Sequence, residues 1–530
     1  MNILLWTLSL LLGAVLLAAL ARRIKVPSPS LLAMGGVLVA LIPDGPRISL
    51  EPDLALALFV APVLMDAAFN NSLRDLRENW IPVTSLVFMA VAVTIATVAL
   101  VARWFVPAMP WPVAVALGAA VAPPDAAAAT AVLKEVQLPH RLVAILEDES
   151  LLNDASALLI YRLAVGAAIA HTGNAIEVTS TLTFILVGSV AAGALFAFAY
   201  GNIVNRFADV PSSIVMQFIG AFGIWILADR LALSGVLAVV TAAVILSRRT
   251  AIHMTAAVRV PSYAVWDLAV FVLNALAFIL AGLQIGPIKD RLDRTPHVHY
   301  VVFALAILVT VILARTGWIF IYSLSTRLAR RVFGTRSPLP PPPPFKNSVL
   351  VSWCGMRGIV TLASALALPD GAGGGPAFPY RDLIVLTAFA VVLGTLIVQG
   401  LTLRVLVMSL GLDDDSPVDS EVRAGRAQIL KAALESLDNP NNDSLDNIDN
   451  HAASAFRRDL TEALRRVDGS VGRSEREHQA EVALRTTAWT AARARLNALR
   501  AAGSIGEAAY QELEKDLDLI ELDADVRSRW

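Results

Sequence analysis

Residues 149–154 (Glu-Ser-Leu-Leu-Asn-Asp) place two carboxylates, a hydroxyl and an amide inside a largely apolar segment, Leu142–Ala170. That segment is long enough to cross a bilayer as one helix. A charged side chain near the bilayer centre costs at least ~2.5 kcal/mol, so an ionisable residue retained there indicates a function. A carboxylate that can be stripped of water in such a place binds either a cation or a proton. Asp154 is the first candidate for this carboxylate.

Two further apolar segments contain interruptions with ionisable residues. Val121–Asp125 (Val-Ala-Pro-Pro-Asp) holds two prolines, and Cys354–Gly358 (Cys-Gly-Met-Arg-Gly) holds an arginine between glycines. Proline removes a backbone donor and clashes with the preceding turn, and it also pushes the residue before it out of the helical region. A kink in each helix is the simpler interpretation. We expect two broken helices, because each interruption carries a charge that a kink does not need.

The charges at the interruptions match the ends of broken helices. Half-helix N-termini carry partial positive charge and C-termini partial negative charge, so Asp125 can offset the former and Arg357 the latter. An unpaired buried charge is strongly unfavourable, and we therefore predict that Glu149 pairs with Arg357. This pairing leaves Asp154 free to exchange its charge; the alternative is a second salt bridge at Asp154.

The spacing around Asp154 assigns its neighbours to different faces. Ser150 lies four residues before Asp154 and shares its helical face. Asn153 points elsewhere, and we expect it to satisfy backbone groups that a broken helix leaves free.

The composition indicates an all-α polytopic membrane protein. Of 530 residues, 56% are hydrophobic and 16% are charged, whereas soluble domains carry about 25% charged residues. The net charge of −1 gives no general attraction to nucleic acid. The single cysteine, Cys354, excludes an intramolecular disulfide framework. Residues 1–20 lack the basic start of a signal peptide, so we expect a retained first helix.

We predict about thirteen transmembrane helices, because this number of apolar segments is long enough to span the bilayer. The fourth to sixth segments and the eleventh to thirteenth would have opposite orientations, each with a broken helix in second place. This is the arrangement of inverted-repeat transporters, in which the broken helices cross mid-membrane at the site. The predicted segments are 3–21, 29–43, 53–72, 81–103, 112–133, 142–170, 179–201, 212–229, 231–247, 263–285, 299–323, 347–368 and 383–408.

The distribution of basic residues sets the expected orientation. With the N-terminus outside, roughly seventeen Lys and Arg fall on the cytoplasmic side and roughly seven outside. We therefore expect a transmembrane domain at 1–410 and a cytoplasmic helical tail at 411–530. The tail has amphipathic helical patterns at 451–468, 473–502 and 506–524, and both regulatory and assembly roles are open for it.

Two other arginines fall inside predicted helices. We expect Arg162 to snorkel towards the interface. For Arg315, we expect core packing or a lipid-facing pair with Trp318.

Three classes of function fit a buried carboxylate in a membrane. A channel would conduct ions without obligatory proton exchange. An intramembrane enzyme would need a catalytic pair, for which only Asp125 and Asp154 offer themselves. Two broken helices around one carboxylate favour a carrier, so we do not expect an enzyme or a bound cofactor.

An ordered set of motifs resembles the monovalent cation:proton antiporter family 1, the bacterial sodium/proton exchangers. The resemblance covers most of residues 1–410. It rests on residues 64–69 (Leu-Met-Asp-Ala-Ala-Phe), 74–77 (Arg-Asp-Leu-Arg), 123–126 (Pro-Pro-Asp-Ala), 149–154, 274–284 and 355–358 (Gly-Met-Arg-Gly).

The resemblance implies a scaffold and dimerisation domain beside a six-helix core that moves, hence a homodimer in the cell membrane. It implies that Asp154 carries the cation or the proton, and that Asp154, Ser150 and Asp66 coordinate Na⁺ with the backbone near Pro124. Asparagine before this aspartate resembles the electroneutral branch, one proton for one cation. The expected substrates are Na⁺ or Li⁺, with K⁺ also open, and the expected role is pH homeostasis.

Two positions differ from the family pattern. The family often has threonine where this chain has Pro124, which supplies only a carbonyl oxygen. The acidic residue at position 66 is often glutamate, whereas the shorter Asp66 reaches an ion through water.

Overall fold

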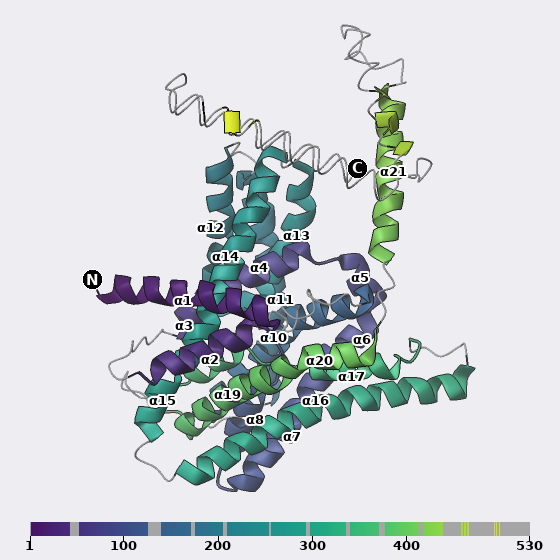
Figure 1. Ribbon diagram of the computed structural model, residues 1–530. Coiled ribbons are helices and arrows are strands. Elements are labelled where there is room, and N and C mark those ends of the chain that lie inside the picture. Colours follow the sequence, from purple (N-terminus) through teal and green to yellow (C-terminus); the bar gives the residue numbers. More distant parts are fainter. Residues whose placement is uncertain are drawn as a thin grey trace. The chain divides into compact units, whose positions relative to one another are not determined.

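Helices form the described part of the chain (Figure 1). The computed structural model describes residues 2–42, 52–125, 139–170, 175–204, 209–253, 256–292, 297–334, 340–369, 377–412 and 417–437, with isolated positions between 457 and 513. These residues include no β-strand. The all-α fold class is therefore confirmed.

The helices follow one another with short connections. Their bounds are α1 Asn2–Ile24, α2 Ser28–Ala40, α3 Pro52–Ala55, η1 Leu56–Val60, α4 Ala61–Asn70, α5 Leu73–Glu78, α6 Trp80–Thr84, η2 Ser85–Ala90, α7 Val91–Phe105, α8 Trp111–Val121, α10 His140–Ala170, α11 Ala175–Val204, α12 Val210–Arg230, α13 Gly235–His253, α14 Ala256–Leu283, α15 Ile285–Leu292, α16 His297–Phe333, α17 Phe345–Trp353, α18 Ile359–Leu366, α19 Arg381–Thr395, η4 Leu396–Gly400, α20 Leu401–Leu410 and α21 Pro417–Leu437. The η segments are π-helical turns inside longer helices.

Each predicted transmembrane segment overlaps a helix of the described chain. Within the described residues, seven helices are long and apolar enough to span a bilayer by themselves. Three shorter apolar helices accompany them, at Ser28–Ala40, Leu56–Asn70 and Trp111–Val121. The structure thus confirms a membrane-spanning helical protein, while the number of about thirteen and the inverted repeat stay predictions.

The chain divides into two compact units, Met1–Asp414 and Asp415–Trp530. The second unit contains α21, Pro417–Leu437. Most of the helical patterns predicted at 451–468, 473–502 and 506–524 lie outside the described residues.

Helix α10 contributes to both hydrophobic cores of the first unit. Leu146 and Tyr161 belong to a core built with α7, α8 and α16 to α19. Leu151 and Ala155 belong to a second core, built with α4 and α11 to α13. The polar stretch 147–154 therefore lies on the helix that joins the two cores.

Glycines let α2 and α14 pack with their backbones in contact. A β-carbon at Gly36 would overlap the carbonyl oxygen of Ile279. A β-carbon at Gly282 would likewise overlap the carbonyl oxygen of Ala33. Small residues at helix crossings allow this close approach in membranes. The contact holds α14, which forms one wall of the cavity described below.

Candidate functional site

The two interruptions predicted in the sequence lie against each other. Helix α8 ends at Val121, and the backbone is non-helical through Asp125, beyond which residues 126–138 lie outside the described chain. Helix α17 ends at Trp353, and α18 begins at Ile359. The second break is therefore confirmed in full. The backbone N–H of Asp125 donates to the carbonyl oxygen of Met356 at 2.7 Å, which joins the two breaks directly.

The Asp125 carboxylate lies at the start of α18. Gly358 is the residue before that helix, and a β-carbon there would overlap the Asp125 side chain. A carboxylate at a helix N-terminus offsets the partial positive charge of the free N–H groups. This is the role predicted for Asp125, and glycine at 358 provides the space that it needs.

Arg357 offsets the opposite ends of the broken helices. Its guanidinium Nε donates to the carbonyl oxygen of Val121, the last residue of α8, at 2.8 Å, and Nη1 donates to the Gly355 carbonyl. Its backbone N–H donates to Thr395 Oγ1 at 3.0 Å. The side chain is 1% exposed. Cations are stabilising at helix C-termini, so the predicted compensation of negative helix ends is confirmed.

The predicted ion pair between Glu149 and Arg357 is wrong. Glu149 pairs with Arg315 of α16 through both carboxylate oxygens, with Arg315 Nη2 2.8 Å from Glu149 Oε2. Gly355 lies against the Arg315 side chain, and a β-carbon there would overlap it. Arg315 reaches Glu149 through this gap, while Arg357 is turned towards the helix carbonyls.

Arg315 therefore has a different role from the one expected. It was predicted to pack in the core or to face lipid with Trp318, but its side chain is 3% exposed and also donates to the Val351 carbonyl at 3.2 Å. The indole of Trp318 instead donates to Ser85 Oγ at 3.1 Å. Arg162 does match its prediction, because its side chain is 47% exposed and Nη1 donates to the Leu233 carbonyl near a helix end.

Asn153 satisfies a backbone group of the first break, as predicted. Its Nδ2 donates to the carbonyl oxygen of Pro124 at 3.2 Å, and its side chain is fully buried. The helix that would normally supply a donor to this carbonyl has ended at Val121. Asn153 thus anchors α10 to the break and holds the neighbouring Asp154 beside it.

A cavity of about 480 Å³ brings the four predicted ion-binding residues together. Asp154, Ser150, Asp66 and Pro124 all line it. Asp154 is 8% exposed, and its carboxylate has no hydrogen-bond or ion-pair partner among the described residues. Asp154 and Ser150 share one face of α10, as their spacing predicts.

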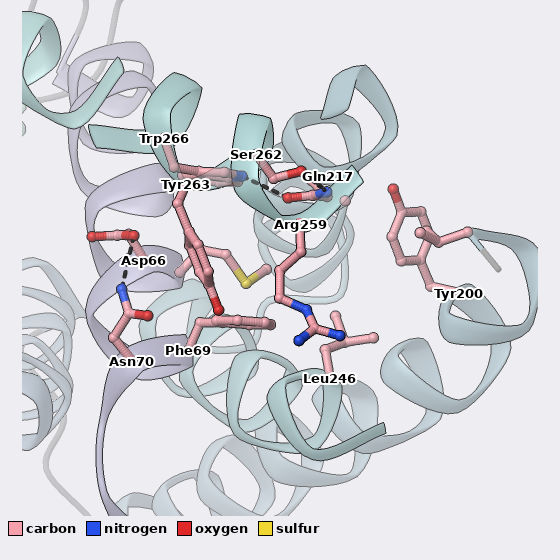
Figure 2. A pocket seen from close by; sticks show the side chains of 13 residues that line it. Asp66, Phe69, Asn70, Tyr200, Gln217, Leu246, Arg259, Ser262, Tyr263 and Trp266 are labelled. Carbon is pink, nitrogen blue, oxygen red and sulfur yellow. Dashed lines mark hydrogen bonds between the residues drawn. The ribbon is translucent and has the colours of Figure 1, made fainter. Parts of the chain in front are cut away.

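Asp66 stands between this cavity and a second, smaller one of about 80 Å³ (Figure 2). Asn70 Nδ2 donates to Asp66 Oδ1 at 3.1 Å, one turn along α4. Figure 2 shows this pair at one edge of the small pocket, apart from the hydrogen-bonded group of Trp266, Gln217 and Ser262. The amide fixes the orientation of the shorter acidic side chain.

Sequence reasoning missed one wall of the large cavity. One face of α14 lines it, with residues at helical spacing: Asp267, Val270, Phe271, Asn274, Ala275 and Phe278. Asp267 is exposed although it lies within an apolar helix. A single carboxylate in an apolar segment, seven residues before an asparagine on the same face, is the signal that could have identified this wall.

The cavity extends from the breaks towards one end of the helices. Its deep part includes Pro123, Pro124 and Asp125 of the first break and Gly358 at the second. Its other end includes Asn71, which follows α4, and Glu147, two turns into α10. Carboxylate, hydroxyl and carbonyl oxygens are the ligands that hard cations prefer. The arrangement can hold a small cation at the breaks and admit it from one side.

Comparison with known proteins gives the same chemistry. A sequence profile described as "Sodium/hydrogen exchanger, transmembrane" matches residues 8–409. A relative from Escherichia coli, "Uncharacterized Na(+)/H(+) exchanger YjcE", is 29% identical over 94% of this chain and 94% of its own length. A relative from Bacillus pumilus, "Sodium, potassium, lithium and rubidium/H(+) antiporter", is 28% identical over 78% of this chain, and the match spans 62% of that relative.

The fold is similar to that of a solved structure. The sodium proton antiporter MjNhaP1 from Methanocaldococcus jannaschii superposes with a TM-score of 0.59 at 19% identity, over 78% of this chain and 100% of that one.

Proposed function

Because the chain belongs to the sodium/hydrogen exchanger family, a family of antiporters and not of enzymes, we propose that it exchanges Na⁺ or Li⁺ for H⁺ at Asp154. The observation that carries the proposal is the cavity that gathers Asp154, Ser150, Asp66 and Pro124 at two touching breaks. K⁺ is a further candidate, since the printed name of the Bacillus relative includes it. A channel and an intramembrane enzyme are not favoured.

Exchange requires only competition for one carboxylate. A charged group in a buried site is disfavoured unless a proton or a cation neutralises it. If the core of the protein moves only when Asp154 is neutralised, each crossing carries either one cation or one proton. Ser150 and the Pro124 carbonyl would complete the cation's coordination, and Asp66 would contribute through water.

The remaining charges support an electroneutral cycle. Glu149 is bound to Arg315, and the Asp125 and Arg357 charges lie at helix ends that they compensate. Asn153 carries no titrating group beside Asp154. Asp154 is then the one carboxylate that changes its charge, and one proton moves against one cation.

The orientation follows from the placement of basic residues. With the N-terminus outside, α4 runs inward, so the end of the cavity near Asn71 and Glu147 opens to the cytoplasm. We place the protein in the cell membrane as a homodimer surrounded by lipid. Residues 1–410 form the exchanger, and 411–530 form a cytoplasmic tail.

The decisive experiment measures proton release in everted vesicles by dye quenching, with Na⁺, Li⁺ or K⁺ added across a pH series. Asp154→Asn should abolish exchange for every cation, because it removes the titrating charge and keeps the size of the side chain. Asp229→Asn is the matched control, since Asp229 is 59% exposed and outside the cavity. Normal cation-dependent proton release by Asp154→Asn would disprove the assignment.

The stoichiometry has its own test. Proteoliposomes carry an imposed potential of either sign, set with K⁺ and valinomycin once vesicles have established that K⁺ alone drives no exchange. Electroneutral exchange predicts rates and end points that do not respond to the potential. A response would indicate a second titrating carboxylate, with Asp66 the first to substitute.

A further inference from the structure

Thr361 has a buried hydroxyl that no described residue satisfies. It is the third residue of α18, directly after the second break, and it lines the cavity that holds Asp154. The residue is 1% exposed, and its Oγ1 has no hydrogen-bond partner in the described part of the chain. Buried polar groups are nearly always hydrogen bonded, so an exception needs an explanation.

The break explains why Thr361 does not bond to its own helix. Buried hydroxyls elsewhere donate to the carbonyl four residues earlier, as Ser364 does to Val360 at 2.7 Å and Thr387 to Leu383 at 2.6 Å. For Thr361 that position is Arg357, which lies in the break, and the intervening Gly358 is extended. The usual local partner is therefore missing.

The first break supplies few oxygen atoms to the cavity. Pro124 has no side-chain oxygen, and its carbonyl already accepts a hydrogen bond from Asn153. Ser150 and Asp154 both come from α10. A hydroxyl from α18 would place an oxygen ligand on the opposite wall, where it would face a cation held between the helices.

We propose that Thr361 Oγ1 is a ligand of the transported cation. This inference rests on the function proposed above. The cation then joins α10 to α18, while a proton on Asp154 needs no contribution from the hydroxyl. Thr361 would therefore determine the apparent affinity for the cation and not the affinity for the proton.

The test uses Thr361→Val, which keeps the shape of the side chain and removes the hydroxyl. We expect the KM for Na⁺ to rise about tenfold, equivalent to about 1.4 kcal/mol of lost binding. The kcat should stay within about twofold of wild type, because the proton step at Asp154 is intact. Thr361→Ser should restore the KM.

Melting temperatures in detergent separate a ligand from a structural group. Because Oγ1 has no partner in the protein, its removal should leave the melting temperature unchanged or raised when no transported cation is present. The stabilisation that saturating Na⁺ gives to wild type should shrink in Thr361→Val. The control is Thr387→Val, which removes a satisfied hydroxyl outside the cavity and should leave the KM unchanged.

Three results would overturn the proposal: an unchanged KM for Na⁺, a lower melting temperature without cation, or a variant that does not fold. Failure of the proposed function looks different. In that case wild type itself would show no cation-dependent proton flux, whatever residue occupied position 361.

Discussion

The guanidinium of Arg315 on α16 grips the carboxylate of Glu149 on α10 in a two-pronged ion pair, with Nη2 2.8 Å from Oε2. Both side chains are at most 3% exposed. Arg315 also donates to the Val351 carbonyl on α17, so the pair connects three helices. Because both charges are matched and buried, the pair stabilises the arrangement around Asp154 and does not exchange ions itself.

We predict that Arg315→Ala destabilises the protein by about 3–5 kcal/mol, because truncation leaves the Glu149 charge buried without a partner. The readout is the melting temperature in detergent. Arg162→Ala is the control, since that side chain is nearly half exposed and its loss should cost little. An Arg315→Ala protein that melts like wild type would show that the pair contributes nothing.

Asn153→Ala should lower stability by about 1–3 kcal/mol, because the Pro124 carbonyl loses its donor in a buried place. Cation-dependent proton release should remain measurable, since Asp154 is retained. Thermal unfolding and the vesicle assay together check this. Complete loss of transport in a stably folded variant would instead make Asn153 part of the exchange step.

Gly282→Ala should separate α2 from α14, because the added β-carbon would overlap the Ala33 carbonyl oxygen. Overpacking of this kind costs about 1–3 kcal/mol, and the displaced α14 would also disturb the cavity wall. Gly286→Ala is the matched control, because its β-carbon would meet its nearest neighbour at an ordinary distance of 3.9 Å. Equal melting temperatures for the two variants would contradict the close contact.

Asp267→Asn should raise the KM for Na⁺ about two- to tenfold without changing kcat, because a carboxylate in a cavity wall concentrates cations near the site. The effect should fall as ionic strength rises, since the Debye length is about 10 Å at 0.1 M salt. Transport measured at low and high choline chloride gives the comparison. An effect of the same size at both would point to direct coordination.

Asp209 caps the N-terminus of α12, where its carboxylate accepts from the Ser212 N–H at 3.0 Å. The hydrogen bonds from Ser212 lower the pKa of this carboxyl below its usual 3.8. Its contribution to stability is therefore present above pH 3.8 and is lost as the pH falls through the lowered pKa. Asp209→Ala should melt earlier than wild type at neutral pH, and the difference should vanish at strongly acidic pH. Asp209→Asn keeps the cap, so its own contribution should not depend on pH.

The roles that the sequence predicted correctly are those set by local chemistry. The prolines at 123 and 124 and the glycines at 355 and 358 stop helices wherever they occur, because they lack a donor or a side chain. Helix ends have a known sign of charge, so Asp125 and Arg357 could be assigned to them before any contact was known. The four-residue spacing of Ser150 and Asp154 placed both on one face of one helix.

Tertiary structure alone decided which distant groups meet. The rule that a buried charge needs a partner applies equally to Arg315 and Arg357, and it does not say which one reaches Glu149. That choice depends on how α16 and α17 rotate against α10, and on the space left at Gly355. The cavity face of α14 and the unsatisfied hydroxyl of Thr361 depend in the same way on packing between helices far apart in the chain. The sequence determined what each group needs, and the packing of the helices determined what it finds.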